Sequence, residues 1–437
     1  MPETGLRLGV FGAGYVGLVT AACFAERGHT VVVCDSDVQK AALLQSGGIP
    51  FAEPGLAQLV AHNVAAGRLH FTENPVSAVA GCAIVFIAVG TPAGADGRAD
   101  ISAVCAAATA IGRAIDGPVL IVNKSTVPVE TGDLLASIVR TEDQVGHDVL
   151  VASNPEFLRE GYAISDFTHP DRIVLGCEDR RSEAILRALY ASFDAPIVAV
   201  DMRTAEMIKY TANAFLATKI SFVNEVAGIC ERVGANIDAV VAGIGADRRI
   251  GREFLEAGIG FGGSCLPKDV NALRRTAEDN AVESVLLDAV MHVNRRQIAH
   301  VVARTDALVN NLRGRRVAIW GLAFKAGTDD VRESPAIALI EALLVAGAVI
   351  AAHDPLAVPN ARAALGDRIA FFDGTDHVAA ASGADALVLA TAWPLYRAAD
   401  FGGLAAVMRG LVVIDARNGF DPQAVTGAGL VYAGVGR

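Results

Sequence analysis

Three glycines near the start of the chain constrain its fold more than any other feature. The apolar run Leu6–Phe11 leads directly into Gly12-Ala13-Gly14-Tyr15-Val16-Gly17, and a helical pattern then continues to about Arg27. A second apolar run, Thr30–Cys34, follows the helix and ends at Asp35. A strand, a tight turn, a helix and a second strand form a β-α-β unit, in which the two strands pair in parallel. The N-terminal part is therefore predicted to form a parallel, doubly wound sheet.

The same alternation recurs along the rest of the chain. Further strand-like runs are separated by Ala-rich helical stretches and lie at residues 83–89, 119–122 and 149–152. A second strand series follows Arg316 and passes through residues 317–320, 350–353, 386–390 and 411–415. The pattern between the two series is helical, at residues 204–233 and 282–309. We predict an α/β chain with two Rossmann-like domains, residues 1–202 and 301–437, joined by a central helical segment, residues 203–300.

Composition excludes several classes of partner. The chain has 437 residues and a formal net charge of −11, without a long basic run, so we expect it to bind neither nucleic acid nor an anionic membrane. The start, Met1 to Arg7, does not have the pattern of a signal peptide, and no segment approaches the ~20 consecutive apolar residues that span a bilayer. The seven cysteines are odd in number and never spaced as C-x-x-C, which argues against a disulfide framework or a thiolate zinc site. We expect a cytoplasmic protein without a metal.

The glycine turn also predicts a ligand. Glycines in this pattern let a pyrophosphate approach the backbone, and the N-terminus of the following helix attracts the phosphates. Asp35, about 20 residues further on, is placed to accept hydrogen bonds from ribose hydroxyls and to repel a 2′-phosphate, so NAD is favoured over NADP. Lys40 either touches the adenosine ribose or is a solvated surface lysine. The expected cofactor contacts in this region are Gly12, Gly14, Tyr15, Val16, Gly17, Asp35 and Lys40. The alternative is a glycine-rich turn of some other α/β protein.

A cysteine in a glycine-rich loop is the candidate reactive group. Cys265 lies within Phe261-Gly262-Gly263-Ser264-Cys265-Leu266-Pro267-Lys268-Asp269. Ser264 and Pro267 favour the start of a helix, and a thiol at a helix N-terminus beside a lysine favours the thiolate. The alternative is a buried cysteine that acts as a small hydrophobic residue. We favour the reactive thiol.

Motifs spread over nearly the whole chain resemble the UDP-glucose/GDP-mannose dehydrogenase family. The matching segments are Gly12–Gly17, Val89–Pro92, Lys124–Pro128, Asn154–Gly161, Lys209–Ala214, the Cys265 loop, Gly321–Lys325 and Arg332–Pro335. The resemblance implies an enzyme that oxidises C6 of a nucleotide sugar to a carboxylate with two NAD molecules. In this chemistry a cysteine traps the aldehyde as a thiohemiacetal, the second oxidation gives a thioester, and water hydrolyses it. Cys265 matches the family nucleophile.

The resemblance also ranks the substrates. The segment Asp247-Arg248-Arg249-Ile250-Gly251 resembles enzymes that act on UDP-glucose more than those that act on GDP-mannose. The Ser264-Cys265 pair differs from the Gly-His-Cys of relatives that oxidise UDP-N-acetylhexosamines. UDP-glucose is therefore the first expectation. GDP-mannose or another UDP-hexose, a two-electron hydroxyacid dehydrogenase and a non-catalytic nucleotide-sugar sensor remain as alternatives.

Five further residues are expected to act beside Cys265. Lys209 and Asn213 share one face of a predicted helix, where a cation and an amide donor suit the oxygen of a tetrahedral intermediate. Asp269 lies four residues after Cys265, and the resemblance implies that it holds a catalytic water. The resemblance also implies that Glu156 activates water and that Thr126 orients it. Surface, capping or helix-dipole roles are the alternatives for these residues.

Other contacts are implied by the resemblance alone. Glu160 would share a helical face with Glu156 if Pro155 opens a helical turn. Further cofactor contacts are expected at Thr91, Thr126, Glu160, Lys268 and Arg332. Substrate contacts are expected at Glu156, Phe157, Leu158, Glu160, Lys209, Asn213, Phe254, Leu255, Gly258, Gly262 and Lys325. Arg249 would reach the site of a neighbouring subunit, which implies at least a homodimer built on the central helices. Glu130 stands where relatives usually carry glycine, so the turn near Thr126 is a local departure.

Overall fold

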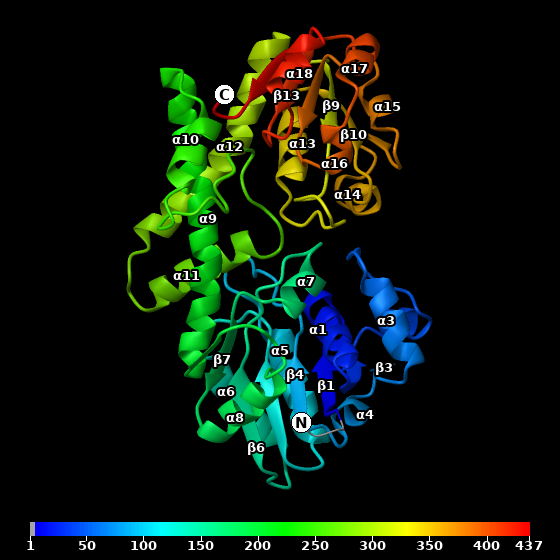
Figure 1. Ribbon diagram of the computed structural model, residues 1–437, viewed down its shortest axis with the longest axis vertical. Coiled ribbons are helices and arrows are strands. Elements are labelled where there is room, and N and C mark those ends of the chain that lie inside the picture. The colour runs from blue at the N-terminus through cyan, green and yellow to red at the C-terminus, as the bar shows by residue number, and fades with distance from the viewer. Residues whose placement is uncertain (1–4) are drawn as a thin grey trace. The chain divides into compact units, whose positions relative to one another are not determined.

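The computed structural model describes residues 5–437 and consists of two compact units. The first unit runs to Ala212 and includes Asn271–Asp279, and the second comprises Asn213–Val270 and Asn280–Arg437. Two helices, α9 (Met202–Val233) and α11 (Leu266–Asp279), contribute residues to both units. Figure 1 labels many of the elements of each unit.

An eight-stranded sheet forms the centre of the first unit, in the order β3-β2-β1-β4-β5-β6-β7-β8. Its strands are β1 (Arg7–Phe11), β2 (Thr30–Cys34), β3 (Leu69–Thr72), β4 (Ile84–Ile87), β5 (Val119–Asn123), β6 (Val149–Ser153), β7 (Ile173–Cys177) and β8 (Ile197–Val200). Neighbouring strands pair in parallel except β6 and β7, which are antiparallel. The sheet is therefore doubly wound, with one reversal near its β8 edge.

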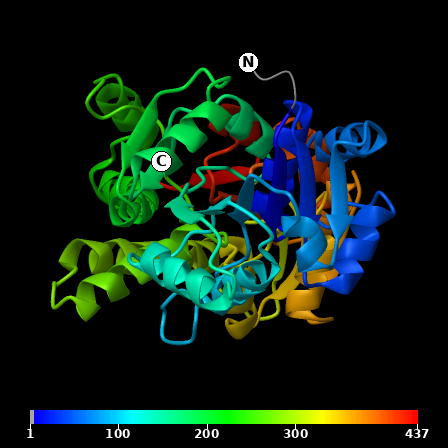
Figure 2. The same cartoon turned by 90° about the horizontal axis from the view of Figure 1, so that it is seen from below.

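Side chains of the central strands alternate between two cores, as the period of two in a strand requires. In β4, Ile84 and Phe86 belong to one core, whereas Val85 and Ile87 belong to the other. Helices cover both faces of this sheet (Figures 1 and 2). They are α1 (Tyr15–Glu26), α2 (Val38–Gln45), α3 (Leu56–Ala65), α4 (Pro75–Val79), α5 (Ser102–Ala114), α6 (Thr131–Glu142), α7 (Ala163–Thr168) and α8 (Arg180–Leu189). Because both faces are buried, the strands are continuous apolar runs.

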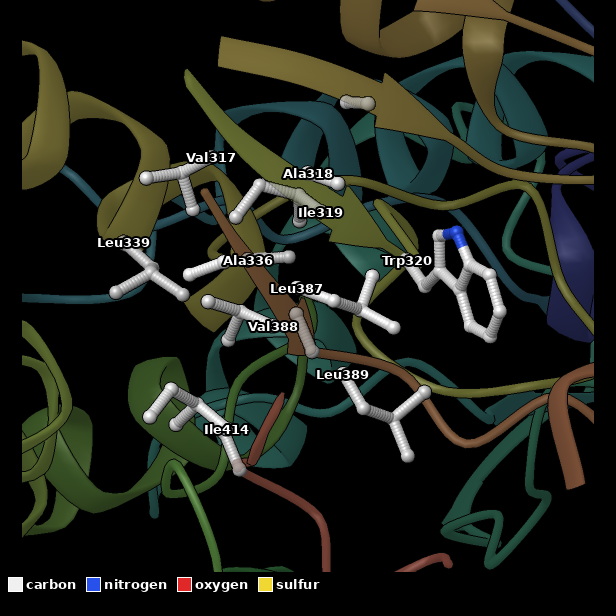
Figure 3. Packing of buried hydrophobic residues seen from close by; sticks show 14 of the residues in the cluster. Val317, Ala318, Ile319, Trp320, Ala336, Leu339, Leu387, Val388, Leu389 and Ile414 are labelled. Carbon is white, nitrogen blue, oxygen red and sulfur yellow. The ribbon is translucent and has the colours of Figure 1, made fainter. Parts of the chain in front are cut away.

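The second unit repeats the strand plan of the first. Its six-stranded sheet has the order β11-β10-β9-β12-β13-β14, which matches the first six strands of the other sheet. The strands are β9 (Arg316–Trp320), β10 (Val349–His353), β11 (Ala370–Phe372), β12 (Ala386–Leu389), β13 (Val412–Asp415) and β14 (Val431–Gly434). Figure 3 shows how β9 and β12 supply the middle of this core, with Leu339 of the covering helix packed against them.

Eight helices lie wholly within the described residues of the second unit. They are α10 (Ile237–Gly245), α12 (Val285–Val309), α13 (Pro335–Val345), α14 (Val358–Leu365), α15 (His377–Ala381), α16 (Pro394–Arg397), α17 (Phe401–Val407) and α18 (Pro422–Gly427). Helices α9 and α12 pack together, and the Ser221 hydroxyl donates to the Val290 carbonyl at 2.8 Å.

A glycine turn follows the first strand of each sheet. Gly12 has φ +102° and donates its N–H to the Cys34 carbonyl, and Gly321 has φ +96° and donates to the His353 carbonyl. The aspartates that end the neighbouring strands differ. Asp354 is fully buried, and its carboxylate accepts from the N–H groups of Leu322, Ala323, Leu356, Ala357 and the Trp393 indole. The corresponding residue of the first unit, Asp35, is described with the site below.

The predicted fold class is confirmed: two Rossmann-like, mainly parallel sheets with a central helical segment. The predicted strands at 30–34, 119–122 and 149–152 match β2, β5 and β6 to within one residue. The division at residues 202 and 300 stays a prediction. Within residues 5–437, no helix combines the length and apolar character that crossing a membrane requires.

Candidate active site

The glycine turn after β1 has the geometry that a bound pyrophosphate requires. A Cβ on Gly17 would stand 1.9 Å from the Gly12 carbonyl oxygen, so this glycine lets α1 pack closely on the turn. A Cβ on Gly14 would meet nothing within 4 Å, so the space above the turn is open. Gly14 is also the N-cap of α1, and no side chain caps the helix there. The N–H groups of Tyr15 and Val16 begin the helix, and such groups suit phosphate oxygens.

Asp35 lies at the end of β2, beside this turn. Its carboxylate accepts from the N–H of Ala13 at 2.7 Å and from the N–H of Asp37 at 2.9 Å. The ammonium of Lys40 lies 3.1 Å from the same carboxylate. Asp35 lies at the carboxyl ends of the strands, and 9% of its surface is exposed. The chain therefore brings the glycine turn, Asp35 and Lys40 together, as the dinucleotide pattern predicts.

A buried carboxylate that the sequence did not indicate holds the start of α1. The Tyr15 hydroxyl lies 2.7 Å from the Glu53 carboxylate and 2.7 Å from the Arg159 carbonyl. Glu53 also accepts from the N–H groups of Gly161 and Ala163. Burial and the Glu53 charge together raise the pKa of Tyr15 far above its usual value, so the hydroxyl stays protonated. This network fixes the loop that contains Glu160 against the proposed cofactor turn.

Glu156 and Lys209 form a buried ion pair in the first unit. Their side chains are 6% and 5% exposed, and the Lys209 ammonium lies 3.0 Å from the Glu156 carboxylate. The other Glu156 oxygen accepts from the N–H of Leu158 at 2.5 Å. The ammonium also lies 5.2 Å from the centre of the Phe157 ring. The charges of Glu156 and Lys209 are held in fixed positions with little water, which strengthens their effect on a nearby reacting group.

Pro155 does not open a helical turn, which was the condition for Glu156 and Glu160 to share a helical face. Residues 154–159 have no regular structure, so Glu156 and Glu160 do not share a helical face. The backbone N–H groups here donate to side-chain carboxylates and not to carbonyls one helical turn earlier. The N–H of Leu158 donates to Glu156, and the N–H of Arg159 donates to Asp166. Such local bonds compete with helix formation.

Lys124 is a further buried cation. The sequence analysis placed it in one of the matching motifs but gave it no role. Its ammonium donates to the Asn154 side-chain oxygen at 3.0 Å, and the same oxygen lies 2.5 Å from the Tyr190 hydroxyl. Burial lowers the pKa of Lys124 to about 8; the Lys209 charge also lowers it, against the opposing effect of Glu156. Lys124 is therefore a lysine that can lose its proton near neutral pH.

Thr126 lies in a tightly held segment between β5 and α6. Its carbonyl accepts from the Thr91 hydroxyl at 2.8 Å, and the Ser125 hydroxyl donates to the Val89 carbonyl at 2.8 Å. A small pocket is lined by Asn123, Ser125, Thr126, Val127, Ser153, Pro155, Glu206 and Lys209. Thr126 and Lys209 thus line one pocket of the first unit. Glu130, the departure noted above, has φ +78° and is the N-cap of α6.

Cys265 is exposed at the start of α11. The helix begins at Leu266, and the N–H of Asp269 donates to the Cys265 carbonyl at 2.9 Å, so Cys265 opens its first turn. The Ser264 hydroxyl lies 3.7 Å from the sulfur. Four of the seven cysteines are buried and two are partly buried, whereas Cys265 is the exposed one. Burial raises the pKa of the Cys23 thiol to about 12, which illustrates the inert alternative that Cys265 does not adopt.

Asp269 is held by two donors next to this turn. It is 1% exposed, and its carboxylate accepts from the Asn213 amide at 2.6 Å and from the Lys268 ammonium at 2.5 Å. Asn213 and Lys209 lie one turn apart on α9, as predicted. One N–H of the Asn213 amide is engaged with Asp269, and an amide has a second for another acceptor.

The glycines before Cys265 permit close packing within the second unit. A Cβ on Gly262 would stand 2.1 Å from the Glu333 carbonyl oxygen, and one on Gly258 would stand 2.8 Å from the Ala416 carbonyl oxygen. The preceding Phe254 has φ +63°, a conformation that costs energy for a residue with a Cβ and often marks a functional site. Leu255 beside it is buried.

Arg417 holds the same loop and had no signal in the sequence. Its guanidinium donates to the carbonyls of Ala390, Gly260 and Phe324 at 2.8, 2.9 and 3.2 Å. Burial lowers the pKa of Arg417 to about 10. This side chain connects the Cys265 loop to the segment that contains Lys325.

The remaining predicted contacts lie at the surface of the second unit. The Lys325 ammonium lies 5.5 Å from the centre of the Phe324 ring. Arg332 and Arg249 each pair with an aspartate two residues earlier, and the Arg249 side chain is 89% exposed. Within residues 5–437, no group of three or more His, Cys, Asp or Glu side chains is arranged to hold a metal ion.

The predicted residues divide between the two units. The first unit contains the glycine turn, Asp35, Lys40, Thr91, Thr126, Glu156, Phe157, Leu158, Glu160 and Lys209. The second contains Asn213, Arg249, Phe254, Leu255, Gly258, Gly262, Cys265, Lys268, Asp269, Lys325 and Arg332. Each unit thus brings together a coherent set: a dinucleotide turn with a buried ion pair in one, and an exposed thiol with a held carboxylate in the other.

Comparison with known proteins matches this chain from end to end. Profiles of the UDP-glucose/GDP-mannose dehydrogenase family match in succession: the NAD binding domain at residues 6–194, the central domain at 203–296 and the UDP binding domain at 318–422. The chain is 46% identical to UDP-glucose 6-dehydrogenase TuaD of Bacillus subtilis, over 99% of this chain and 93% of that protein. It is 46% identical to UDP-glucose 6-dehydrogenase of Rhizobium meliloti, over 99% of this chain and 100% of that protein. A solved UDP-glucose dehydrogenase from the archaeon Pyrobaculum islandicum matches with a TM-score of 0.93 and 42% identity, over 100% of this chain and 98% of that chain.

Proposed function

Since the chain belongs to the UDP-glucose/GDP-mannose dehydrogenase family and is an NAD-dependent dehydrogenase, we propose that it oxidises UDP-glucose at C6 to UDP-glucuronate. The substrate proposal is supported by the two relatives named UDP-glucose 6-dehydrogenase, each 46% identical over 99% of this chain. The observation that carries the chemistry is the exposed Cys265 at the first turn of α11, next to a carboxylate held by two donors. An exposed thiol in this position suits a nucleophile.

Cys265 acts between the two oxidations. Its thiolate adds to the carbon of the C6 aldehyde and forms a thiohemiacetal, which keeps the aldehyde from leaving. Loss of a second hydride from that carbon gives a thioester, and water hydrolyses it to the carboxylate and regenerates the thiolate. NAD, when bound, would supply the hydride acceptor for both oxidations. The glycine turn, Tyr15, Val16 and Asp35 would hold it, together with Lys40, Thr91, Glu160, Lys268 and Arg332.

Charged groups of fixed geometry support the tetrahedral steps. Lys209 and the second Asn213 N–H stabilise the negative oxygen of each intermediate. Glu156, already 3.0 Å from the Lys209 ammonium, activates the water that hydrolyses the thioester. Asp269 holds that water and moves protons, and Thr126 orients the water near the reacting carbon. These roles are supported by burial, since Lys209, Glu156 and Asp269 are each no more than 6% exposed.

The nucleotide sugar is bound mainly by the second unit in this proposal. Phe254, Leu255, Gly258, Gly262 and Lys325 contact it there, and Phe157 and Leu158 contact the sugar from the first unit. The strained backbone of Phe254 supports this assignment, because non-glycine residues with positive φ concentrate at binding sites.

The protein acts as a homodimer in this proposal, built on α9. Phe215, Phe222 and Ile229 are spaced seven residues apart on that helix and are 64%, 53% and 56% exposed. Residues seven apart lie on one helix face, so these side chains form an apolar stripe that a second copy would cover. Arg249, extended into solvent, would reach the partner's site. Sedimentation analysis of the Phe222→Glu variant tests this: a dimer that survives the substitution unchanged contradicts the interface.

Cofactor stoichiometry tests the chemistry. Incubation of a limiting amount of UDP-glucose with excess NAD should yield two NADH per sugar. The Cys265→Ala variant should not form NADH at a rate comparable to that of wild type. One NADH per sugar, or full activity of Cys265→Ala, would contradict the four-electron mechanism and favour a two-electron dehydrogenase. Cys265→Ser should form a slowly hydrolysed ester that intact-protein mass spectrometry detects.

A panel of substrates that includes GDP-mannose and other UDP-hexoses tests the identity of the sugar. If no member of the panel gives NADH, the result indicates a nucleotide-sugar sensor.

A further inference from the structure

Glu206 is a buried carboxylate that the proposed chemistry does not use. It lies on α9 one turn before Lys209, and it is 4% exposed. One of its oxygens accepts from the N–H of Glu130 at 2.8 Å, and the other accepts from the N–H of Gly132 at 2.8 Å. These N–H groups stand at the N-terminus of α6, where they have no acceptor in their own helix. Glu206 therefore caps α6 from a different helix.

Burying a charged group to cap this helix costs free energy. Neutral Ser or Asn side chains satisfy such N–H groups without a buried charge. The cations on the same helix have other principal partners, because Arg203 donates to Asp133 at 2.9 Å and Lys209 pairs with Glu156 at 3.0 Å. The hydrogen bonds of the Glu206 carboxylate described here are therefore with backbone N–H groups and not with these cations. Buried groups of this kind concentrate at functional sites.

The position of Glu206 relates it to Thr126 and Lys209. All three side chains line the same pocket, and Glu206 and Lys209 lie three residues apart on one helix face. The two N–H groups that Glu206 holds follow Thr126 by four and six residues along one short segment. Movement of the α6 start would therefore displace Thr126 relative to Lys209.

We propose that Glu206 is a positioning residue, whose carboxylate holds the segment between Thr126 and α6 in register with Lys209 through two backbone N–H groups. This inference rests on the proposed function for its catalytic consequence. The bonds need the ionised form, because each oxygen accepts one N–H, and a protonated carboxyl turns one oxygen into a donor.

Proton binding to Glu206 would therefore release the segment near neutral pH. Burial raises the pKa of Glu206 to about 7; the N–H bonds of Gly132 and Glu130 and the Arg203 charge lower it, and the Asp133 charge raises it. The charged groups around Glu206 are Arg203 and Lys209 on its own helix, Asp133 on α6, Glu130 in the preceding turn and Glu156, which is paired with Lys209. Below that pH the segment loses its cap.

The pH profile of kcat distinguishes positioning from bulk stability. The kcat of wild type should fall as the pH is lowered, with a midpoint near the Glu206 pKa of about 7. This fall is called the acid limb, and the pH profile of Glu206→Gln should lack that limb. At pH 8 its kcat should be about tenfold to hundredfold lower, the scale for a misplaced reacting group. The matched control is Glu231→Gln on the same helix, which removes a partly buried carboxylate bonded to Gly436 and Arg304 and should keep the limb. A Glu206→Gln enzyme with the wild-type limb and a kcat within twofold overturns the proposal.

Hydrogen exchange tests the same contact without any activity. In wild type, protection of the Glu130 and Gly132 amides, corrected for intrinsic rates, should be lost between pH 8 and pH 6. The same amides should exchange faster in Glu206→Gln at pH 8, and the wild-type comparison remains decisive if that variant does not fold. Unchanged protection overturns the proposal even in an active enzyme. Absence of NADH from every nucleotide sugar, with the protection changes present, would refute the proposed function and leave the contact standing.

Discussion

The left-handed backbone at Glu130 gives a stability prediction that can be worked out from the structure. Glu130 has φ +78° and ψ −1° at the N-cap of α6. This conformation costs a residue with a Cβ about 1–2 kcal/mol, and glycine adopts it without that cost. Glycine also gains freedom in the unfolded chain, which costs the folded state about 0.4–1 kcal/mol.

The side-chain interaction of Glu130 is weak by comparison. Its carboxylate lies 3.3 Å from the Arg203 guanidinium, and the two side chains are 67% and 59% exposed. Solvent screens a surface pair of this kind, so it contributes little, and Arg203 keeps its bonds to Asp133. Glu130→Gly should therefore leave the free energy of unfolding unchanged or raise it by up to about 1.5 kcal/mol.

Glu130→Ala separates the two contributions. Alanine loses the ion pair but keeps the Cβ, so this variant should be slightly less stable than wild type. Glu130→Gly should exceed Glu130→Ala by about 1 kcal/mol, which corresponds to roughly 2–4 °C in the melting temperature of a unit of this size. Thermal unfolding followed by circular dichroism measures the difference. An alanine variant as stable as the glycine variant would refute the assignment of strain to Glu130.

Three further predictions follow from buried groups and close contacts. Lys209→Met should lower the free energy of unfolding by about 3–5 kcal/mol because it leaves Glu156 buried without its cation, and the double variant with Glu156→Gln should recover much of this in urea unfolding. Gly17→Ala places a Cβ 1.9 Å from a carbonyl oxygen, so NADH affinity measured by fluorescence should fall at least about tenfold, whereas Gly117→Ala, with open space at its Cβ, should leave it unchanged. The pKa of Lys124 is lowered from 10.5 to about 8, so between these pH values the unfolded state binds more protons and stability rises with pH. Urea unfolding measures the difference in free energy of unfolding between wild type and Lys124→Met. This difference should change in favour of wild type from pH 8 to pH 10. A difference that stays constant would contradict the lowered pKa of Lys124.

The sequence was most informative where one local pattern dictates one structure. The apolar run Thr30–Cys34 is β2 to the residue, because a strand buried on both faces needs an uninterrupted apolar run. Short strands such as β3 and β11 carry polar or aromatic residues at a sheet edge and give no comparable signal. The antiparallel β7 was also not predicted, since pairing direction depends on contacts distant in the sequence.

The site was predictable by motif but not by partner. Lys209 and Asn213 were placed on one helix face by spacing, yet nothing local indicated that Asn213 would donate to Asp269. Pro155 does not open the helical turn on which the Glu156 and Glu160 pairing depended, because carboxylates of Glu156 and Asp166 accept from backbone N–H groups there. Glu206 has no distinguishing signal, since a glutamate within a helix is ordinarily a surface residue. Its role depends on a helix start that lies some 75 residues earlier in the chain.

The complete engagement of Asp354 has a consequence for ligand selectivity in a chain that contains one architecture twice. The first glycines of the two turns have similar φ angles, +102° at Gly12 and +96° at Gly321. Five protein donors surround the Asp354 carboxylate, which leaves no lone pair for a ribose diol. The Asp354 carboxylate is therefore not available for the ribose contact that Asp35 is placed to make in the first unit. Any redesign of the second unit as another dinucleotide site would first have to remove the Trp393 indole and loosen the turn at Leu322.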